Sequence, residues 1–382
     1  MTRVLWRNFD FWLLGMVALL TVFGITMIRS TIAGNIELIQ LNVVQRQLIF
    51  GIAGFVIALV IASIDYHFWS SVNRPMYLTI VGLLAMLNVV GAAVFGATRW
   101  FQVGAFFIQP SELAKVVMIL VLAEFFSHSQ GKLGDLRWVL RSFLLTSGVV
   151  IWVLLQPNLS TSIVIYVIWF SMLWVSGFQI RHLLYVLGVA TILISILAII
   201  LLNVHVYDIA TKTGIIQPYQ VDRILTFLFP DPEASYGATY NVNQALISIG
   251  SGGILGKGYG QGSQVQLRFL KVRHSDFIFA AISEEFGFVG VALVIALQLF
   301  IIIRCIRIAQ ISRDTFGALI AYGVATLLAF QGIVNMGMNL NLMPVTGLTL
   351  PFISYGGSSL LSNLLGIGLV ESVAVWHKAL EF

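Results

Sequence analysis

The sequence predicts an all-α polytopic membrane protein with about ten transmembrane helices and one long extracytoplasmic loop. Of its 382 residues, 59% are hydrophobic and only 10% are charged, whereas about a quarter of a soluble domain is charged. The mean hydropathy is +0.95, and apolar stretches long enough to cross a ~30 Å hydrocarbon core recur along the chain. The single cysteine, Cys305, excludes an internal disulfide and a cysteine-based metal site. The basic residues behind the net charge of +5 are scattered, which argues against a nucleic-acid partner.

Ten apolar segments are expected to form the spans of a single integral membrane domain, residues 1–382. They cover 11–28, 48–64, 76–95, 110–126, 142–156, 160–178, 183–204, 277–303, 316–338 and 359–376. The uncharged stretch 142–180 is divided at Gln156-Pro157-Asn158, because proline lacks a backbone donor and polar neighbours favour a turn.

The charges of the connections predict the orientation of these spans. With the N-terminus inside, the inner connections and both termini carry eleven lysines and arginines, and the short outer connections carry four. This bias places both termini in the cytoplasm. Residues 205–275, between the seventh and eighth spans, then form the extracytoplasmic loop.

That loop has too many aromatic and branched residues to be disordered. The run 241–249 is expected to be a short helix lying along the membrane, because its apolar residues recur at helical spacing. Gly253-Ile-Leu-Gly-Lys-Gly258 lacks the spacing of a nucleotide-binding phosphate loop. Its glycines would still let the backbone approach a ligand, with Lys257 offsetting phosphate charge; the alternative is a flexible turn with a solvated lysine.

Asp276 stands where the long polar loop gives way to an apolar span. A carboxylate at such a boundary can reach an aqueous substrate and is desolvated enough to act as a base. The alternative is an interfacial acid that starts a helix, since the macrodipole favours aspartate in a first turn.

Glu112 and Lys115 open the fourth span, three residues apart and therefore on one helix face. An ionised side chain inside a span costs about 2.5–3.5 kcal/mol or more, so such groups pair or line a wet cavity. We prefer a polar cavity wall on the same side as Asp276; a structural ion pair is the alternative.

The connection 335–359 contains no charged residue, two prolines and several glycines. Irregular backbone at membrane depth is tolerated only when it is buried in protein or lines a cavity. We expect this segment to re-enter the bundle and to contribute the hydroxyls of Ser354, Tyr355 and Ser358 to a site; a plain surface loop is the alternative.

With these residues assembled, the chain closely resembles the SEDS family of cell-wall polymerases, whose members are RodA, FtsW and SpoVE. The resemblance spans nearly the whole chain, and its motifs occur in the family's order. They are Arg99-Trp100, Gln109-Pro-Ser-Glu112 with Lys115, Pro218-Tyr-Gln220 with Arg223-Ile224, Gly250-Ser-Gly-Gly253 with Gly256-Lys-Gly258, His274-Ser-Asp-Phe-Ile-Phe-Ala280, Glu284-Glu285 and Leu350-Pro-Phe-Ile-Ser-Tyr-Gly-Gly-Ser-Ser359. The pieces Arg273-His-Ser-Asp276, Asn335-Met-Gly-Met338 and Pro344-Val-Thr-Gly347 look more like the elongation member RodA.

The resemblance implies a ten-helix glycosyltransferase that joins lipid II units into glycan strands on the outer face of the cytoplasmic membrane. It implies that Asp276 is the essential acid. It also implies a class B penicillin-binding protein, a transpeptidase, as the activating partner, alongside other membrane proteins of the elongation complex. One departure is Asn158, where the family commonly has aspartate, so a charged role at that position is in doubt.

Polymerisation requires a sugar hydroxyl to attack the anomeric carbon of a lipid-pyrophosphate donor. We hypothesise that Asp276 takes the proton of the acceptor's 4-hydroxyl, a contribution of ~10²–10⁴-fold, and that the displacement inverts the α-linked donor to a β-1,4 product. Cations, backbone donors or a divalent ion such as Mg²⁺ would stabilise the leaving pyrophosphate. The candidate substrate-binding residues are Glu112, Lys115, Arg46, Arg99, Arg223, Lys257, Ser354, Tyr355 and Ser358.

Three alternatives remain open. A lipid II flippase would also be a multi-span protein with acids in its spans, although it needs a hydrophilic route to both faces. A non-catalytic scaffold for the transpeptidase would tolerate the loss of Asp276. A polymerase specific to division or sporulation would carry the same motifs.

Overall fold

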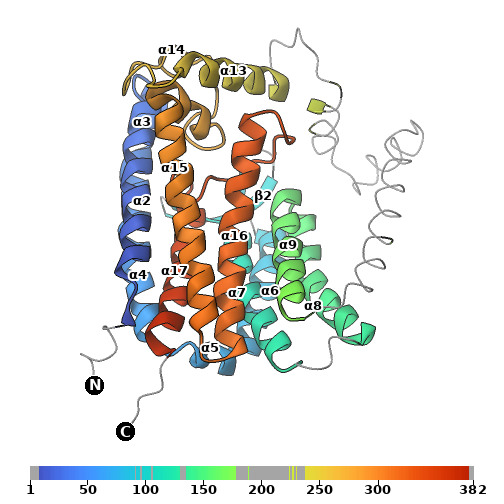
Figure 1. Cartoon of the computed structure of the whole chain (residues 1–382). Coiled ribbons are helices and arrows are strands. Elements are labelled where there is room, and N and C mark those ends of the chain that lie inside the picture. The colour runs from blue at the N-terminus through green and yellow to red at the C-terminus, as the bar shows by residue number, and fades with distance from the viewer. Residues whose placement is uncertain are drawn as a thin grey trace.

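The computed structural model describes residues 8–90, 92–94, 97–104, 106–129, 135–177 and 237–377, with single positions at 188, 223, 226, 227 and 229. Figure 1 shows a bundle of long helices with short elements across its ends. The long helices are α2 (Phe11–Thr31), α4 (Val43–Ser63), α6 (Asn73–Val90), α7 (Pro110–Ser127), α8 (Leu136–Leu155), α9 (Leu159–Val175), α15 (Ile278–Ile311), α16 (Thr315–Asn339) and α17 (Gly357–Trp376). The short helices are α3 (Ile36–Gln40), α5 (His67–Ser71), α13 (Gly237–Gly252) and α14 (Ser263–Gln266).

Nine of the ten predicted spans coincide with these long helices, and the seventh, 183–204, lies outside the described residues apart from position 188. Within the described part of the chain, six helices are long and apolar enough to cross a membrane by length and composition. The predicted break at Pro157 is confirmed, because α8 ends at Leu155 and α9 starts at Leu159. Asn158 caps α9 by accepting a hydrogen bond from the Thr161 backbone.

The end of the third predicted span is wrong. Helix α6 stops at Val90, and β1 (Ala92–Val94), β2 (Ala97–Val103) and β3 (Phe106–Ile108) form an antiparallel meander in that order. An apolar run as short as 92–95 does not distinguish a helix from a strand by periodicity. The guanidinium of Arg99 on β2 donates to the carbonyls of Gln156 (2.9 Å) and Pro157, so the meander holds the α8–α9 turn.

Helix α17 is buried along almost its whole length, in the middle of the bundle. Its close neighbour is α4: a methyl group on Gly368 would lie 2.8 Å from the Ala58 Cα, so the two backbones approach as only glycine allows. Many large apolar side chains on α2, α4, α8 and α15 are exposed, Trp12, Val60, Leu155 and Leu293 among them. Exposed apolar faces of this extent are those of helices that face lipid.

The two ends of the bundle carry different polar contacts. At one end, the Asp10 end, the Asp10 carboxylate caps α2 and accepts from Arg304 of α15 (2.8 Å), and the Asp10 backbone donates to Glu371 of α17. At the opposite end, the Asp276 end, the Arg273 guanidinium donates to the carbonyl of Thr31, where α2 finishes. Helix α13 lies across the Asp276 end, as expected for the run 241–249 (Figure 1).

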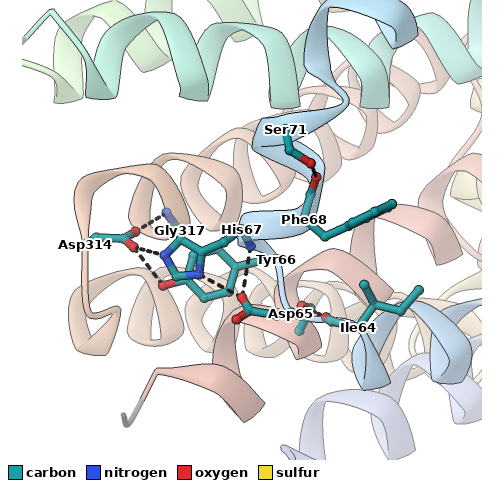
Figure 2. Close-up of polar contacts among 9 residues, drawn as sticks. Ile64, Asp65, Tyr66, His67, Phe68, Ser71, Asp314 and Gly317 are labelled. Atoms are coloured by element: carbon teal, nitrogen blue, oxygen red, sulfur yellow. Dashed lines mark hydrogen bonds and ion pairs between the residues drawn. The ribbon is translucent and has the colours of Figure 1, made fainter.

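A second cluster at the Asp10 end joins the α4–α5 turn to the start of α16 (Figure 2). The His67 ring lies between two carboxylates, 2.7 Å from Asp65 and 2.6 Å from Asp314. Tyr66 donates its hydroxyl to Asp314 (3.0 Å), and Asp314 caps α16 by accepting from the Gly317 backbone. Burial and the neighbouring Asp314 raise the pKa of Tyr66, which therefore stays a neutral donor.

Candidate functional site

Asp276 lies two residues before the first residue of α15, so its predicted place at the edge of a span is confirmed. Its side chain is half-buried at the Asp276 end of the bundle. Burial raises the pKa of the Asp276 carboxyl above its ordinary value, and a hydrogen bond from Ser275 and the charge of Arg223 oppose that rise. A carboxylate with this balance can hold a proton temporarily, as a general base requires.

Arg223 is brought to Asp276 by the loop 340–356, which follows α16. The Arg223 guanidinium donates to the Thr346 carbonyl (2.9 Å), and the next residue is Gly347. A methyl group on Gly347 would lie 3.7 Å from Asp276 Oδ2 and 3.9 Å from Arg223 Nη2. Gly347 has a φ of +75°, a left-handed conformation that favours glycine. The acid and the guanidinium therefore face one glycine that leaves space beside both.

The loop 340–356 re-enters the bundle, as predicted. Its backbone approaches α2 so closely that a methyl group on Gly24 would lie 2.6 Å from the Ile353 Cα. Gln47 of α4 donates to the Ser354 carbonyl and accepts from the Gly356 backbone (both 3.2 Å). Gln298, far along α15, donates to the Pro351 carbonyl. The irregular backbone thus finds side-chain partners inside the protein.

The hydroxyls predicted in this region have structural partners. Ser354 donates to the Ser275 carbonyl (2.8 Å) and accepts from the Leu350 backbone, so it attaches the loop to the residue beside Asp276. The Tyr355 backbone donates to His274 (2.9 Å). Burial raises the pKa of the Tyr355 hydroxyl, and the charge of nearby Arg46 opposes the rise. Arg46 therefore lies on the same side of the bundle as the loop.

Glu112 and Lys115 form a buried ion pair, with 2.7 Å between Lys115 Nζ and Glu112 Oε2. Ser362 of α17 also donates to Glu112 (3.4 Å). The structure therefore shows the ion pair that was the alternative, inside the bundle between α7 and α17, and the preferred cavity wall stays a prediction. Ser358, the remaining predicted hydroxyl, accepts from the Gln109 backbone (3.0 Å), just before α7.

Two further contacts connect the start of α7 to the loop near Asp276. Asn158 donates to Ser111 (3.3 Å), and Ser160 donates to the Thr346 carbonyl (2.6 Å), the same carbonyl that Arg223 contacts. Sequence reasoning did not identify Ser160. Asn158 works here as a neutral donor and helix cap, which needs no charge.

Lys257 belongs to a different cluster. Its ammonium lies 2.7 Å from both Glu284 Oε1 and Ser263 Oγ. Glu284 is fully buried and also accepts from the backbones of Gln264 and Val265. A phosphate-binding role for Lys257, still a prediction, would require this ion pair to open.

The glycine-rich segment 250–258 forms backbone hydrogen bonds with α15 where that helix is interrupted. Gly287 has φ 62° and ψ −162°, which interrupts the helix. The carbonyls of Glu284 and Glu285 accept instead from Lys257 and Gly258, both at 2.9 Å. The amides of Phe288 and Val289 donate to Gly253 and Ile254 (2.9 and 3.1 Å). These backbone bonds replace the missing i to i+4 pairs of the helix, so the glycines have a structural role.

Some predictions fall beyond what the structure describes. The motif Pro218-Tyr-Gln220 and most of the loop before residue 237 lie outside the described residues. Within the described ranges, no group of three histidine, cysteine, aspartate or glutamate side chains could hold a metal ion.

The chain is similar to known proteins over nearly its whole length. The model of the FtsW, RodA and SpoVE family, described as "Cell cycle protein", matches residues 11–379. The chain is 33% identical over 377 residues to the probable peptidoglycan glycosyltransferase FtsW of Trichlorobacter lovleyi, covering 97% of this chain and 94% of that protein. It is 35% identical over 328 residues to the peptidoglycan glycosyltransferase MrdB of Escherichia coli, covering 86% and 84%.

The fold is similar to that of a chain whose structure has been solved. A chain from the solved structure "Structural coordination of polymerization and crosslinking by a peptidoglycan synthase complex" superposes with a TM-score of 0.77. Its sequence identity to this chain is 29%, and the match covers 97% of this chain and 99% of that one.

Proposed function

Because the chain belongs to the FtsW, RodA and SpoVE family, we propose that it is an inverting peptidoglycan glycosyltransferase that polymerises lipid II into β-1,4 glycan strands. The observation that carries the proposal is the half-buried Asp276 carboxylate beside Arg223 at one end of a membrane bundle. A flippase needs no such paired acid at a single end, whereas a polymerase needs a base and a cation next to each other.

Asp276 is the general base in this mechanism. Its carboxylate takes the proton of the acceptor's 4-hydroxyl as that oxygen attacks the anomeric carbon of the donor. The bond from the anomeric carbon to the new oxygen forms, and the bond to the pyrophosphate oxygen breaks. The electron pair leaves with the pyrophosphate, and the proton passes from Asp276 to water. Attack from the face opposite the leaving group inverts the anomeric carbon.

Arg223 is the cation best placed for the leaving group or the acceptor, because it shares the space at Gly347 with Asp276. Arg46 lies on the same side, as its effect on Tyr355 indicates. Lys115 and Lys257 are already paired with glutamates, and Arg99 holds the α8–α9 turn, so these three contribute mainly through structure. A divalent cation such as Mg²⁺ is proposed only as a companion of the substrate's phosphates, because no described cluster would hold it.

The Asp276 end is proposed to be extracytoplasmic. Arg74, Arg137, Arg304 and Arg313 are at or near helix ends on the opposite, Asp10 side, and positive charge favours the cytoplasmic side. Both termini would then be cytoplasmic. The chemistry would use lipid-linked sugar that has already crossed the membrane.

The partner is proposed to be a class B penicillin-binding protein, since polymerised strands must be crosslinked. The similar chain with a solved structure comes from a peptidoglycan synthase complex that coordinates polymerisation and crosslinking. The motifs that resemble RodA favour a role in cell elongation and shape, within a complex of other elongation proteins. A division or sporulation role is the alternative, because an FtsW relative is about as similar as MrdB.

The deciding experiment uses the purified full-length protein, labelled lipid II and detergent, with no membrane to cross. We expect glycan polymer from the wild type and none from Asp276→Asn, which keeps the shape and loses the basicity. Asp135→Asn is the matched control, because Asp135 caps α8 and asparagine caps equally well. Absence of polymer from the wild type, with and without a class B transpeptidase, would favour transport. Polymer formed at the normal rate by a folded Asp276→Asn protein would refute the assignment of Asp276 as the general base.

A further inference from the structure

Two buried asparagines lie on consecutive turns of α16, on the face that meets the start of α15. Asn335 and Asn339 are four residues apart and fully buried. A buried amide costs free energy unless it is hydrogen-bonded, so two of them in an apolar helix need a reason. Their partners supply it, since both contact Asp276.

Asn335 connects two segments through one amide group. Its Nδ2 atom donates to the Asp276 carbonyl (3.1 Å) and to the Leu348 carbonyl (2.7 Å). An amide nitrogen has two hydrogens, so these two bonds use the donor completely. Leu348 belongs to the loop that holds Arg223 through Thr346. The Asn335 side chain therefore links the backbone of Asp276 to the loop that positions Arg223.

Asn339 completes the arrangement one turn further along. Its Nδ2 donates to the same Asp276 carbonyl (3.0 Å) and to the Asn335 carbonyl of its own helix (2.8 Å). Its Oδ1 accepts from the Ala280 backbone (3.2 Å), in the first turn of α15. The cap residue of α15, Phe277, has no side-chain acceptor. Asn339 thus caps α15 from a neighbouring helix.

We propose that Asn335 and Asn339 are positioning residues that hold Asp276 at a fixed distance from Arg223, an inference that rests on the proposed function of Asp276. Neither side chain needs to touch the substrate. Each acts through the Asp276 carbonyl, and Asn335 also acts through Leu348. Loss of the hydrogen bonds of Asn335 and Asn339 would separate Asp276 from Arg223 without removing either residue.

The chain offers a matched control in Gln331, one turn before Asn335 on the same face of α16. Gln331 is equally buried, and neither amide atom has a hydrogen-bond partner among the described residues. Gln331→Leu removes a buried amide from the same helix but leaves the hydrogen bonds of Asn335 and Asn339 in place. We expect its polymerisation rate and pH profile to match those of the wild type.

The test measures lipid II polymerisation by Asn335→Leu, Asn339→Leu and Gln331→Leu against pH. We expect each asparagine variant to lose ~10-fold or more in kcat, because misplacement by ~1 Å can cost 10²-fold, while KM changes little. We also expect the acidic limb of the rate profile to move to higher pH, because Asp276 loses the charge of Arg223. A structural defect alone would lower the amount of active protein and leave that limb in place. Asn335→Ser, which keeps one donor, should fold where Asn335→Leu does not, with an intermediate shift.

Backbone hydrogen exchange separates this proposal from the assignment of Asp276 itself. In Asn339→Leu the amide of Ala280 should exchange faster, and in Gln331→Leu it should not. Faster exchange with an unmoved pH limb in both asparagine variants would overturn the positioning role. A normal rate in Asp276→Asn would instead overturn the proposed function, whatever the asparagine variants do.

Discussion

Asp276 Oδ2 and Arg223 Nη2 lie on the same side of Gly347, where a single methyl group would fill the space beside both. Arg223 belongs to the long loop, Gly347 to the re-entrant loop and Asp276 to the turn before α15. Three segments far apart in sequence therefore meet at the acid. Burial and Arg223 act on the Asp276 carboxyl in opposite directions.

Removing Arg223 should move the pH dependence of polymerisation. Asp276 must be deprotonated to act, so the rate falls as pH drops through its pKa. Arg223→Gln removes a charge that lowers this pKa, so the acidic limb should move to higher pH. Arg268→Gln is the control, because Arg268 donates to the Gly34 carbonyl at the same end. If the acidic limb of the rate profile lies at the same pH in the wild type and in Arg223→Gln, Arg223 does not lower the pKa of Asp276.

Asp276→Asn should stabilise the folded protein at neutral pH while abolishing polymerisation. The folded pKa of Asp276 is raised, so the native state binds the proton more tightly than the unfolded chain does. Stability then falls as pH rises from the ordinary carboxyl pKa through the folded one. Neutral asparagine avoids that loss. Thermal unfolding in detergent at pH 7 checks it, and a lower melting temperature for Asp276→Asn would count against a desolvated acid.

Replacing Lys115 alone should damage the fold. Lys115→Met leaves Glu112 buried without its cation, and breaking a buried pair in this way costs ~3–5 kcal/mol. The double variant Glu112→Gln/Lys115→Met should recover most of that stability. We expect it to polymerise at close to the normal rate, because the pair is buried between α7 and α17 and glutamine can still accept from Ser362. Loss of polymerisation in a folded double variant would show instead that the pair contributes to the site directly.

Gly287→Ala should be severely destabilising. Its φ and ψ belong to a region that only glycine adopts at low cost, a penalty of about 1–3 kcal/mol. In addition, the new methyl would lie 2.3 Å from the Gly256 nitrogen. Gly82→Ala, inside α6, has no atom within 4 Å of the new methyl and should be neutral or slightly stabilising. Comparable melting temperatures for the two variants would contradict the need for glycine where α15 is interrupted at position 287.

The spans and the place of Asp276 at a span edge could be predicted because their signals are local. Apolar stretches ended by charge, proline or glycine marked α2, α4 and α7 to within a few residues, and Asp276 was conspicuous as an acid at a span edge. The spacing of Glu112 and Lys115 placed them on one helix face, but it did not decide between an ion pair and the preferred cavity wall. These inferences need only nearest neighbours along the chain.

The remaining features depend on partners distant in sequence. Lys257 looked available for phosphate, yet it is paired with Glu284 of α15, 27 residues further along the chain. The β meander replaced a helix end because 92–94 pairs with residues that follow it. Asn335 and Asn339 were missed because neutral amides carry no charge signal. The available clues were their spacing of four residues on an apolar helix and the place of Asn335 in the motif Asn335-Met-Gly-Met338.

The last prediction concerns His67, at the end of the bundle away from Asp276. Burial disfavours the charged ring, but the hydrogen bonds and charges of Asp65 and Asp314 outweigh it and raise the pKa of His67. A raised histidine pKa stabilises the fold fully below the unfolded value of about 6.5, and this stabilisation is lost as pH rises through the folded pKa. Wild type should therefore exceed His67→Gln in melting temperature at pH 5, and the difference should shrink towards pH 9.

The effect should be small, because the ring is nearly half exposed and solvent screens the pair. His128→Gln is the control: that histidine is 74% exposed and, among the charged groups that the structure describes, contacts only Glu124. Tyr66 shares Asp314 with His67, so Tyr66→Phe should keep the pH dependence and lose only a hydrogen bond. A melting difference between wild type and His67→Gln that stays constant from pH 5 to 9 would show that His67 acts by packing, with no charge bridging α5 and α16.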